Sequence, residues 1–275
     1  VLETNFYGSS VYFDEMTIFE DQIETAFQGP EQFRSFVSMI MQNASDLIEQ
    51  AHEDMARMTL ANLIGAKKIY QDTVDTTGTH VVNLLTEYNA YAGTTLTAAT
   101  VKQPANFEPF IKWAYAYIKT VSDKMTERSN LYHYNFGENI ARHTPKRDQR
   151  LFIYSPEINN VEASVLSSVF HPDEVSNKID ITERVNFWQG IKSGGTINVT
   201  PSYVNALGAS TTGTAQSLDY VFAVLMDREA AGVTMVNQWS DSIWNPRGGY
   251  SNLYWHFTDR YYNDFSENAV IFIIK

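Results

Sequence analysis

The feature that most constrains the fold is a long run of apolar residues at helical spacing. Between Pro30 and Gly65, apolar side chains recur at steps of three and four, which predicts one face of an α-helix. Pro30 suits the first turn because its missing N–H would be unpaired there, and we expect Gly65 to end the helix. At 1.5 Å per residue, a helix over residues 30–64 is roughly 50 Å long and needs an equally extended element to cover it. The apolar face consists of Phe33, Val37, Ile40, Ala44, Leu47, Ala51, Met55 and Met58.

The rest of the chain mixes helical and strand patterns, which predicts a mixed α+β fold in one large domain or two interleaved lobes. A second helix is predicted from its apolar positions between Phe107 and Met125. Residues 66–106 are polar and Thr-rich and predict short strands joined by turns, whereas residues 200–216 predict an exposed loop. Strands are predicted around residues 9–19, 151–155, 218–226, 233–236, 250–257 and 268–275, and a helix that carries Val161, Val165, Leu166 and Val169 is predicted after Pro156.

A strong turn precedes an unusually aromatic strand in the segment "WNPRGGYSNLYWHF". Pro246 restricts φ, while Gly248 and Gly249, after Arg247, permit the positive φ that a reversal requires. Because side chains alternate along a strand, Leu253, Trp255 and Phe257 share one face, and Tyr254 and His256 share the other. We predict that the first face lies on the long helix and that the second meets solvent or a neighbouring subunit.

Composition excludes several classes of function. The formal net charge is −12, with no basic block to neutralise phosphates, which argues against direct electrostatic binding of nucleic acid. The absence of cysteine excludes disulfides, thiolate metal sites and a cysteine nucleophile. No apolar run approaches the roughly 20 residues that cross a bilayer, so no membrane is expected. The first residues do not form a signal peptide, and the missing initiator Met indicates that Val1 follows either a cleavage or a further segment upstream.

The candidate catalytic patterns each lack a required member. The segment from His52 to Ala56 begins like a zinc-protease motif, but Ala56 stands where the second histidine is needed. Ser210 lacks the spacing of a nucleophile elbow, and Gly194-Gly195 lacks the residues of a phosphate-binding loop. Adjacent carboxylates point apart and cannot flank a substrate. The remaining weak candidates are Ser167, Ser168 and His171, the pairs Asp14-Glu15 and Asp173-Glu174, and the glycosylation tripeptides at Asn43 and Asn198. We therefore expect no catalytic residue, no cofactor and no metal, which favours a structural or binding role.

Four segments together resemble the major capsid proteins of small tailed bacteriophages related to phi29, which have the Hong Kong 97-like fold. The long-helix region "FEDQIETAFQGPEQFRSFVSMIMQNASDLIEQAHEDMARMTLANLI" looks like the family's spine helix, and "RDQRLFIYSPEINNVEASVLSSVFHPDEV" looks like a unit of its apical domain. "LDYVFAVLMDREAAGVTMV" is similar to a later pair of apical strands, and "WNPRGGYSNLYWHF" with "NAVIF" to the family's turn and returning strands.

The resemblance implies a peripheral domain joined to an inserted apical domain. Residues 1–64 and 250–275 form the peripheral domain with the spine helix and a remnant of the E-loop, and residues 65–249 form the apical domain. The family has an extended N-terminal arm and a long E-loop hairpin before the spine helix, whereas only about 20 residues precede the helical region here. In this scheme Pro246, Arg247, Gly248 and Gly249 make the structural turn, and Leu253, Trp255 and Phe257 lie on the closing strand.

The function that the resemblance implies is a major capsid protein that self-assembles as hexamers and pentamers into an icosahedral phage head around double-stranded DNA. Implied partners are further copies, scaffolding and portal proteins, and packaged DNA without specific binding. The implied location is the virion, after assembly in the host cytoplasm, and no enzymatic activity is implied. Two alternatives stay open: an encapsulin-type compartment shell, and a glycan-binding protein that stacks sugars on Trp239, Trp244, Tyr250, Tyr254 and Trp255.

Overall fold

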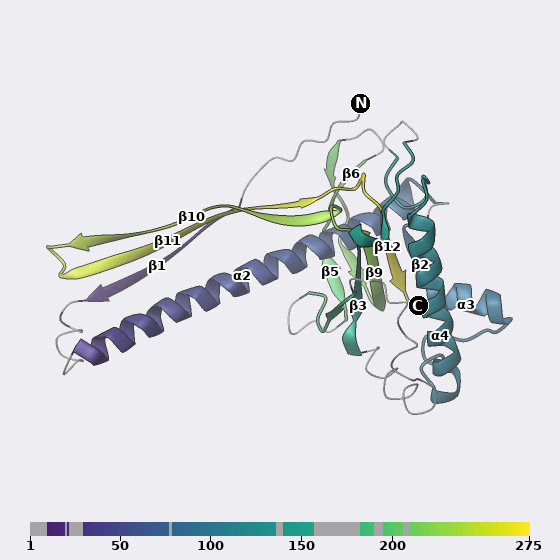
Figure 1. Ribbon diagram of the computed structural model, residues 1–275, viewed down its shortest axis with the longest axis horizontal. Helices are drawn as coiled ribbons and strands as arrows, with labels where there is room; N and C mark the ends of the chain where they lie inside the picture. Colours follow the sequence, from purple (N-terminus) through teal and green to yellow (C-terminus); the bar gives the residue numbers. More distant parts are fainter. Residues whose placement is uncertain are drawn as a thin grey trace. The chain divides into compact units, whose positions relative to one another are not determined.

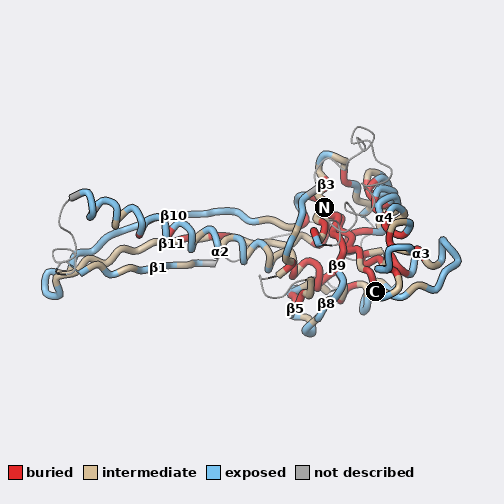
Figure 2. Tube along the Cα trace, turned by 90° about the horizontal axis from the view of Figure 1, so that it is seen from below, coloured by how far each residue is buried: buried red, intermediate tan, exposed pale blue. Residues whose placement is uncertain are grey.

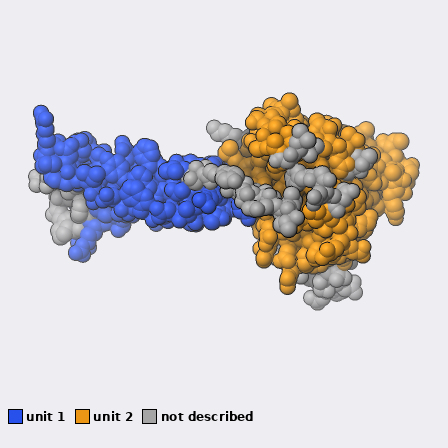
Figure 3. Space-filling model, turned by 90° about the horizontal axis from the view of Figure 1, so that it is seen from above, with its two compact units in different colours: residues 1–56, 232–262 blue, residues 57–231, 263–275 orange. Residues whose placement is uncertain are grey.

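The computed structural model divides into two compact units, shown in different colours in Figure 3. Unit 1 comprises residues 1–56 and 232–262, and unit 2 comprises residues 57–231 and 263–275. These bounds differ from those of the expected peripheral and apical domains, and the assignment of those domains stays a prediction. The structure describes residues 10–19, 21, 30–76, 79–135, 140–156, 182–189, 195–205 and 209–275.

The sheet of unit 1 has three long strands in the order β1-β11-β10 (Figure 1). They are β1 (Ser10–Phe19), β10 (Ala231–Asn245) and β11 (Tyr250–Asn263). Strand β1 pairs antiparallel with β11 over its whole length, from Ser10 opposite Asp259 to Phe19 opposite Tyr250. The predicted strand at residues 9–19 is therefore confirmed as β1, and the aromatic segment is the central strand of this sheet.

Helix α2 (Pro30–Thr73) begins at the predicted proline, but the prediction that Gly65 ends it is wrong. The helix continues because Ala66, Lys67 and Tyr70 are buried in unit 2. Gly65 instead allows a close approach, since a Cβ atom there would lie 2.6 Å from Cγ1 of Val199. This glycine therefore serves packing and does not serve to terminate the helix.

Unit 2 is built on a mixed sheet of five strands in the order β2-β12-β9-β3-β4. The central strand β9 pairs antiparallel with both of its neighbours, β12 and β3, while β2 pairs parallel with β12 and β4 pairs parallel with β3. The strands are β2 (Val81–Asn83), β3 (Gln149–Tyr154), β4 (Thr182–Val185), β9 (Val221–Asp227) and β12 (Ala269–Ile273). The predicted strands at residues 151–155, 218–226 and 268–275 correspond to β3, β9 and β12, and β9 begins three residues later than predicted.

Helices cover both faces of this sheet, and the buried residues in Figure 2 gather around it. Helices α3 (Leu84–Ala92) and α4 (Pro104–Met125) pack on one face, where Phe110 and Phe272 share a core cluster. The last part of α2 covers the other face, where Leu63 belongs to a second cluster with Val224. Every residue of β9 is buried, which is the pattern of a strand with both faces covered.

Two predictions for the connecting regions need correction. Residues 66–106 were expected to hold short strands, but the described part of this range (66–76 and 79–106) contains the end of α2, the single short strand β2, helix α3 and the start of α4. Helix α3 is closed by local signals: Asn83 Oδ1 accepts from the Leu85 N–H, and Gly93 adopts a φ of 65° after the last turn. The expected loop at residues 200–216 contains the paired strands β6 (Ser202–Val204) and β7 (Ser210–Thr212).

Strand β5 (Ile197–Val199), which precedes this region, pairs with β8 (Gln216–Leu218), and a short 3-10 helix spans Lys146–Asp148. The second predicted helix is confirmed as α4, which begins slightly earlier, at Pro104. The helix predicted after Pro156, with Val161, Val165, Leu166 and Val169, lies outside the described residues.

Candidate assembly surface

The turn at Asn245 joins β10 to β11 within unit 1. The Asn245 carbonyl accepts hydrogen bonds from the N–H groups of Gly248 and Gly249 at 3.2 and 3.0 Å. Its side-chain oxygen accepts from the Arg247 N–H at 3.1 Å. Only Gly249 adopts a positive φ, of 63°, whereas Gly248 leaves room for the ring of Tyr250. Asn245, which precedes Pro246, thus organises the turn through both its backbone and its side chain.

One face of the sheet lies toward α2. Phe257 is buried, and its ring meets the ring of His52 edge-on at 6.4 Å. The pairing with β1 places Tyr12, Asp14 and Met16 opposite Phe257, Trp255 and Leu253 respectively. Residues that are directly opposite share a face, so these six side chains form the helix face of the sheet. Leu253 and Trp255 are half-buried there.

The contact between α2 and the sheet in unit 1 is not fully packed. A cavity of about 250 Å³ lies between them, lined by Leu47, Ile48, Ala51 and His52 of the helix and by residues of β1 and β11. Nε2 of His52 lies 2.8 Å from Oδ2 of the buried Asp259, although their orientation does not make a hydrogen bond. Protonation of His52 would turn this approach into an ion pair.

The opposite face of the sheet carries a stack of rings across all three strands. His256 of β11 stacks on Trp239 of β10 with a centroid distance of 3.9 Å and an interplanar angle of 10°. On its other side His256 stacks on Phe13 of β1 at 6.2 Å. Phe13 and Trp239 are 65% and 48% exposed, so this stack lies at the surface of the unit. We call this side, defined by Phe13, Trp239 and His256, the open face.

Unit 1 has little core of its own and a large exposed apolar surface. Among the described residues its buried apolar side chains are Ile40, Ala44 and Phe257. By contrast, it holds twelve of the nineteen large apolar residues that are exposed in the described part of the chain. Figure 2 shows the strands of this unit and the first part of α2 almost entirely as exposed or half-buried. Apolar surface of this extent marks a site of protein association.

The residues considered for catalysis are dispersed in the described structure. His52, Glu53 and Asp54 lie on α2, and no group of three or more possible metal ligands occurs among the described residues. Ser210 begins β7, Asn43 lies in α2 and Asn198 lies in β5. Asp14 and Glu15 lie next to each other on β1. Ser167, Ser168, His171, Asp173, Glu174 and Gly194 lie outside the described residues.

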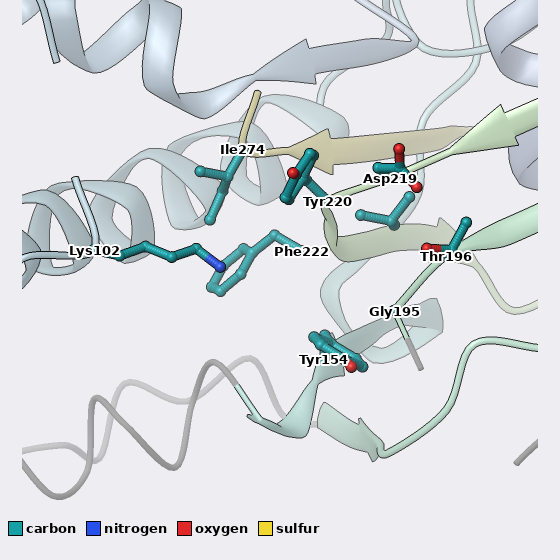
Figure 4. A pocket seen from close by; sticks show the side chains of 9 residues that line it. Lys102, Tyr154, Gly195, Thr196, Asp219, Tyr220, Phe222 and Ile274 are labelled. Atoms are coloured by element: carbon teal, nitrogen blue, oxygen red, sulfur yellow. The ribbon is translucent and has the colours of Figure 1, made fainter. Parts of the chain in front are cut away.

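A pocket of about 410 Å³ opens in unit 2 beside β9 (Figure 4). Its walls include the rings of Tyr154, Tyr220 and Phe222. The Lys102 ammonium lies 5.9 Å from the centroid of the Tyr220 ring, and Tyr220 has a φ of 65°, which is uncommon for a residue other than glycine. The side chains that line the pocket do not form a recognisable catalytic pair.

A buried lysine in unit 2 was not singled out from the sequence. Lys67 of α2 is fully buried, and its Nζ donates to the Tyr132 carbonyl at 2.9 Å and lies 5.0 Å from the Tyr134 ring centroid. Burial lowers the pKa of Lys67 to about 7, although Asp264 and Glu267 partly oppose this. Lys67 therefore anchors the segment after α4 to the helix. The signal that could have revealed it is its place between Ile64 and Tyr70 on the apolar side of the helix.

Two histidines share this polar core. His80 is fully buried with its Nε2 3.3 Å from Oδ2 of Asp75, and His133 is almost fully buried. Burial lowers the pKa of His80 to about 3 and that of His133 to about 4. Both imidazoles are therefore neutral at neutral pH, and the ring of His80 meets the rings of Tyr70 and Tyr134 edge-on.

Comparison with solved structures places the fold among phage capsid proteins. A chain in the capsid structure of Staphylococcus phage Andhra matches with a TM-score of 0.62 and 10% identity, over 97% of this chain and 70% of that one. A chain in the structure of the head fiber and inner core protein gp22 of native bacteriophage P68 matches with a TM-score of 0.65 and 9% identity, over 98% and 72%. At these identities the likeness establishes the fold, which is the Hong Kong 97-like capsid fold.

The family follows from the sequence itself. The family model described as Phi29-like phage major capsid protein matches residues 2–273, nearly the whole chain. The chain therefore belongs to the Phi29-like phage major capsid protein family. No curated protein shows significant similarity to it.

The predicted α+β fold, the predicted family and the predicted role in a capsid are thus confirmed. The chain is a subunit of a multi-subunit phage capsid shell, and it is located in the virion. Neither the encapsulin-type shell nor the glycan-binding alternative gains support. In the described part of the chain, no helix is long and apolar enough to span a membrane.

Proposed function

We propose that copies of this chain assemble as hexamers and pentamers into an icosahedral phage head that encloses double-stranded DNA. The observation that carries the proposal is the contrast within unit 1, where twelve large apolar side chains are exposed and only three apolar residues among those described are buried. When neighbouring copies cover such a unit, its exposed apolar surface is removed from water, which favours association. Each contact between copies then adds only modestly to the affinity. In a closed shell each copy has several neighbours, so the combined affinity is much higher.

Charge supports a wall that holds DNA without binding it. The chain carries 32 acidic and 20 basic residues. Unit 1 is the more acidic part, with thirteen acidic and three basic residues in its two segments. Binding of phosphates depends on lysine and arginine, so a wall of this composition lets packaged DNA move along it. We therefore propose that the packaged DNA is held by the shell and makes no specific contact with this chain.

The remaining parts of the proposal come from the family. We infer that a scaffolding protein and a portal protein are partners, that assembly takes place in the host cytoplasm, and that the chain has no enzymatic activity. Membership of a family of structural capsid proteins supports each of these inferences.

We also infer that the chain is organised as a peripheral domain of residues 1–64 and 250–275 and an apical domain of residues 65–249. In that organisation the turn at Pro246, Arg247, Gly248 and Gly249 returns the chain into the closing strand. The hydrogen bonds to Asn245 and the contact of Phe257 with His52 support this role for the turn and the strand. Leu253 and Trp255 complete the same face of the closing strand.

Electron microscopy of particles from cells that produce the chain with the other head proteins tests the proposal. We expect closed icosahedral particles whose nucleic acid resists nuclease until the shell is opened. If the protein stays monomeric at high concentration, or if intact particles hold protein cargo without DNA, the proposal is wrong.

A further inference from the structure

The open face of unit 1 carries exposed apolar side chains from one end of the sheet to the other. Strand residues two apart share a face, so Val11, Phe13 and Phe19 of β1 lie on the same side as the ring stack. In β10, Val233, Met235 and Ile243 are in phase with Trp239, which stacks on His256. All seven of these apolar side chains are exposed, with Met235 reaching 69%.

The helix face of the same sheet is different. Strand β1 is less exposed on that side, where Tyr12, Met16 and Ile18 are half-buried. Among the residues of β10 whose side chains point to the helix face, only Val236 and Trp244 are large, apolar and exposed. The alternation in these strands therefore does not run from apolar inside to polar outside, as it does in an antiparallel sheet with one solvated face. Both faces of this sheet therefore carry apolar side chains, and neither has the purely polar composition of a solvated face.

The exposed apolar area of the open face lies at the upper end of the range for a monomer and approaches the area that one partner buries in a stable interface. The seven exposed apolar side chains offer on the order of 600 Å² of accessible apolar surface, judged from their exposed fractions and the size of large side chains. A specific interface buries about 800 Å² on each partner, whereas the largest patch on a typical monomer is about 300–600 Å². Charged side chains on this side are few: Glu15 and Asp241 with Arg260.

We propose that the open face is a subunit interface of the shell, and that its occupant is a second copy of this chain. The inference rests on the proposed assembly, because a shell built from many copies places another copy beside each unit 1. In the shell, the stack of Phe13, His256 and Trp239 forms the centre of the contact, where a large aromatic side chain contributes most to binding. The residues around the stack exclude water from it.

A single cysteine provides the first test, because the chain has none of its own. In the Met235→Cys variant the new thiol lies on the open face, and a thiol reagent should label it readily in the free subunit. In purified particles we expect labelling to be at least about tenfold slower, since the centre of an interface is closed to solvent. Labelling at equal rates in free subunits and particles would overturn the inference, although intact particles would leave the proposed shell function standing.

Cross-linking then identifies the occupant. A photoreactive group is attached to the thiol of the Met235→Cys variant and is activated in particles assembled from a mixture of isotopically heavy and light subunits. We expect cross-linked peptides that join a heavy copy to a light copy. Cross-links only within one copy would show that the chain's own residues cover the face, and cross-links to DNA or to another head protein would show a different occupant. Each of these results would overturn the inference.

Two tryptophans of β10 provide a matched pair of variants. Trp239 and Trp244 are both 48% exposed, but they lie on opposite faces of the strand. We expect Trp239→Gln to raise the subunit concentration needed for assembly by at least about tenfold, and Trp244→Gln to have a clearly smaller effect. Circular dichroism checks that each free subunit is folded. Equal effects of the two substitutions on assembly would contradict a contact centred on the open face.

Discussion

Unit 1 and unit 2 use the same kinds of residue in different ways. In unit 2 the central strand β9 is buried throughout, and helices close both faces of its sheet. In unit 1 the 15-residue strand β10 has no buried residue, although Val233, Met235, Trp239 and Ile243 are as apolar as core residues. The difference teaches that apolar content alone does not define a core. Unit 2 buries its apolar surface within one copy, whereas unit 1 leaves much of its apolar surface exposed.

This division of labour has a physical advantage for a shell protein. A subunit must be folded before it assembles, so one part needs a sufficient core of its own. The other part must present surface that becomes buried only on assembly, and such surface cannot also form the monomer's core. The predictions below test this contrast.

The largest difference is expected between two phenylalanines. Phe110 of α4 is fully buried in unit 2, and Phe110→Ala should lower the free energy of unfolding by about 3–5 kcal/mol through lost burial and a cavity. Phe13 of β1 is exposed, and Phe13→Ala should change the stability of the free subunit by no more than about 0.5 kcal/mol. Urea unfolding of the two variants at equal protein concentration measures both values. Similar losses would break the contrast between the units.

The buried lysine predicts a dependence of stability on pH in unit 2. In the unfolded chain a lysine keeps its proton up to a pKa of 10.5, whereas folded Lys67 releases it above about 7. The unfolded state therefore binds more protons in this window, so stability should rise with pH, by about 2 kcal/mol from pH 7 to pH 9. The pKa of Glu267 is raised to about 7, so folded Glu267 keeps its proton to higher pH than the unfolded chain does, which makes stability fall with pH. This fall lies mainly below pH 7 and only slightly reduces the rise between pH 7 and pH 9.

Urea unfolding at pH 7 and pH 9 measures this change, with two variants that separate its source. Lys67→Met removes the titrating group, so its stability should be nearly independent of pH in this range. Lys68→Met is the control, because the neighbouring Lys68 is partly exposed and paired with Asp72. It should keep the rise. If Lys67→Met keeps the full rise, Lys67 is not its source.

Replacement of Gly65 inside α2 by alanine should destabilise the protein, contrary to the usual effect of this substitution in a helix. Replacing glycine by alanine in the middle of a helix usually stabilises it by about 0.5–1 kcal/mol. At Gly65 the added Cβ would meet Val199 at 2.6 Å and Pro201 at 3.2 Å, so Gly65→Ala should destabilise unit 2 by about 1–3 kcal/mol. Gln50→Ala, at an exposed position of the same helix in unit 1, is the control and should be nearly neutral. Thermal unfolding compares the two, and a stabilised Gly65→Ala would show that the packing around it is loose.

The smallest effect comes from two glycines with the same strain. Gly93 ends α3 in unit 2 with a φ of 65°, and Gly249 lies in the turn of unit 1 with a φ of 63°. A Cβ atom added at either position would have no other atom within 4 Å, so only the backbone conformation disfavours a side chain there. An alanine in this conformation costs about 1–2 kcal/mol. We expect Gly93→Ala to lower the stability of unit 2, and Gly249→Ala to speed hydrogen exchange in β10 and β11 by about fivefold to tenfold without changing unit 2. A change in unit 2 caused by Gly249→Ala would show that the two units do not unfold independently.

The fold was most predictable where periodicity is long and local. Helix α2, helix α4 and strand β1 each follow from apolar spacing alone. The end of α2 was not predictable, because Gly65 carries the usual signal for termination and only its contact with Val199, far along the chain, explains why the helix continues. Helix α3 was missed because its nine residues are too few for a clear period, although Asn83 and Gly93 are recognisable caps.

The candidate surface was predictable in part. The alternation along β11 correctly separates Phe257, which contacts the ring of His52 on α2, from His256, which stacks on Trp239. Whether both faces of the sheet are apolar could not be read from one strand, because this depends on which strands lie beside it. The stacking of Phe13 on His256 joins residues more than 200 positions apart, and no local pattern records it.

The place of β12 in the sheet has a consequence for synthesis. Strand β12 lies between β2 and β9, and Ile271 pairs with Val81 on one side and Val224 on the other. During synthesis, the edges of β2 and β9 that pair with β12 have no hydrogen-bond partner strand until residues 269–273 leave the ribosome. Contacts between residues so far apart in sequence form slowly. The open edges of an unfinished chain can pair with other nascent chains. The sheet of unit 2 is complete only after residues 269–273 have been synthesised.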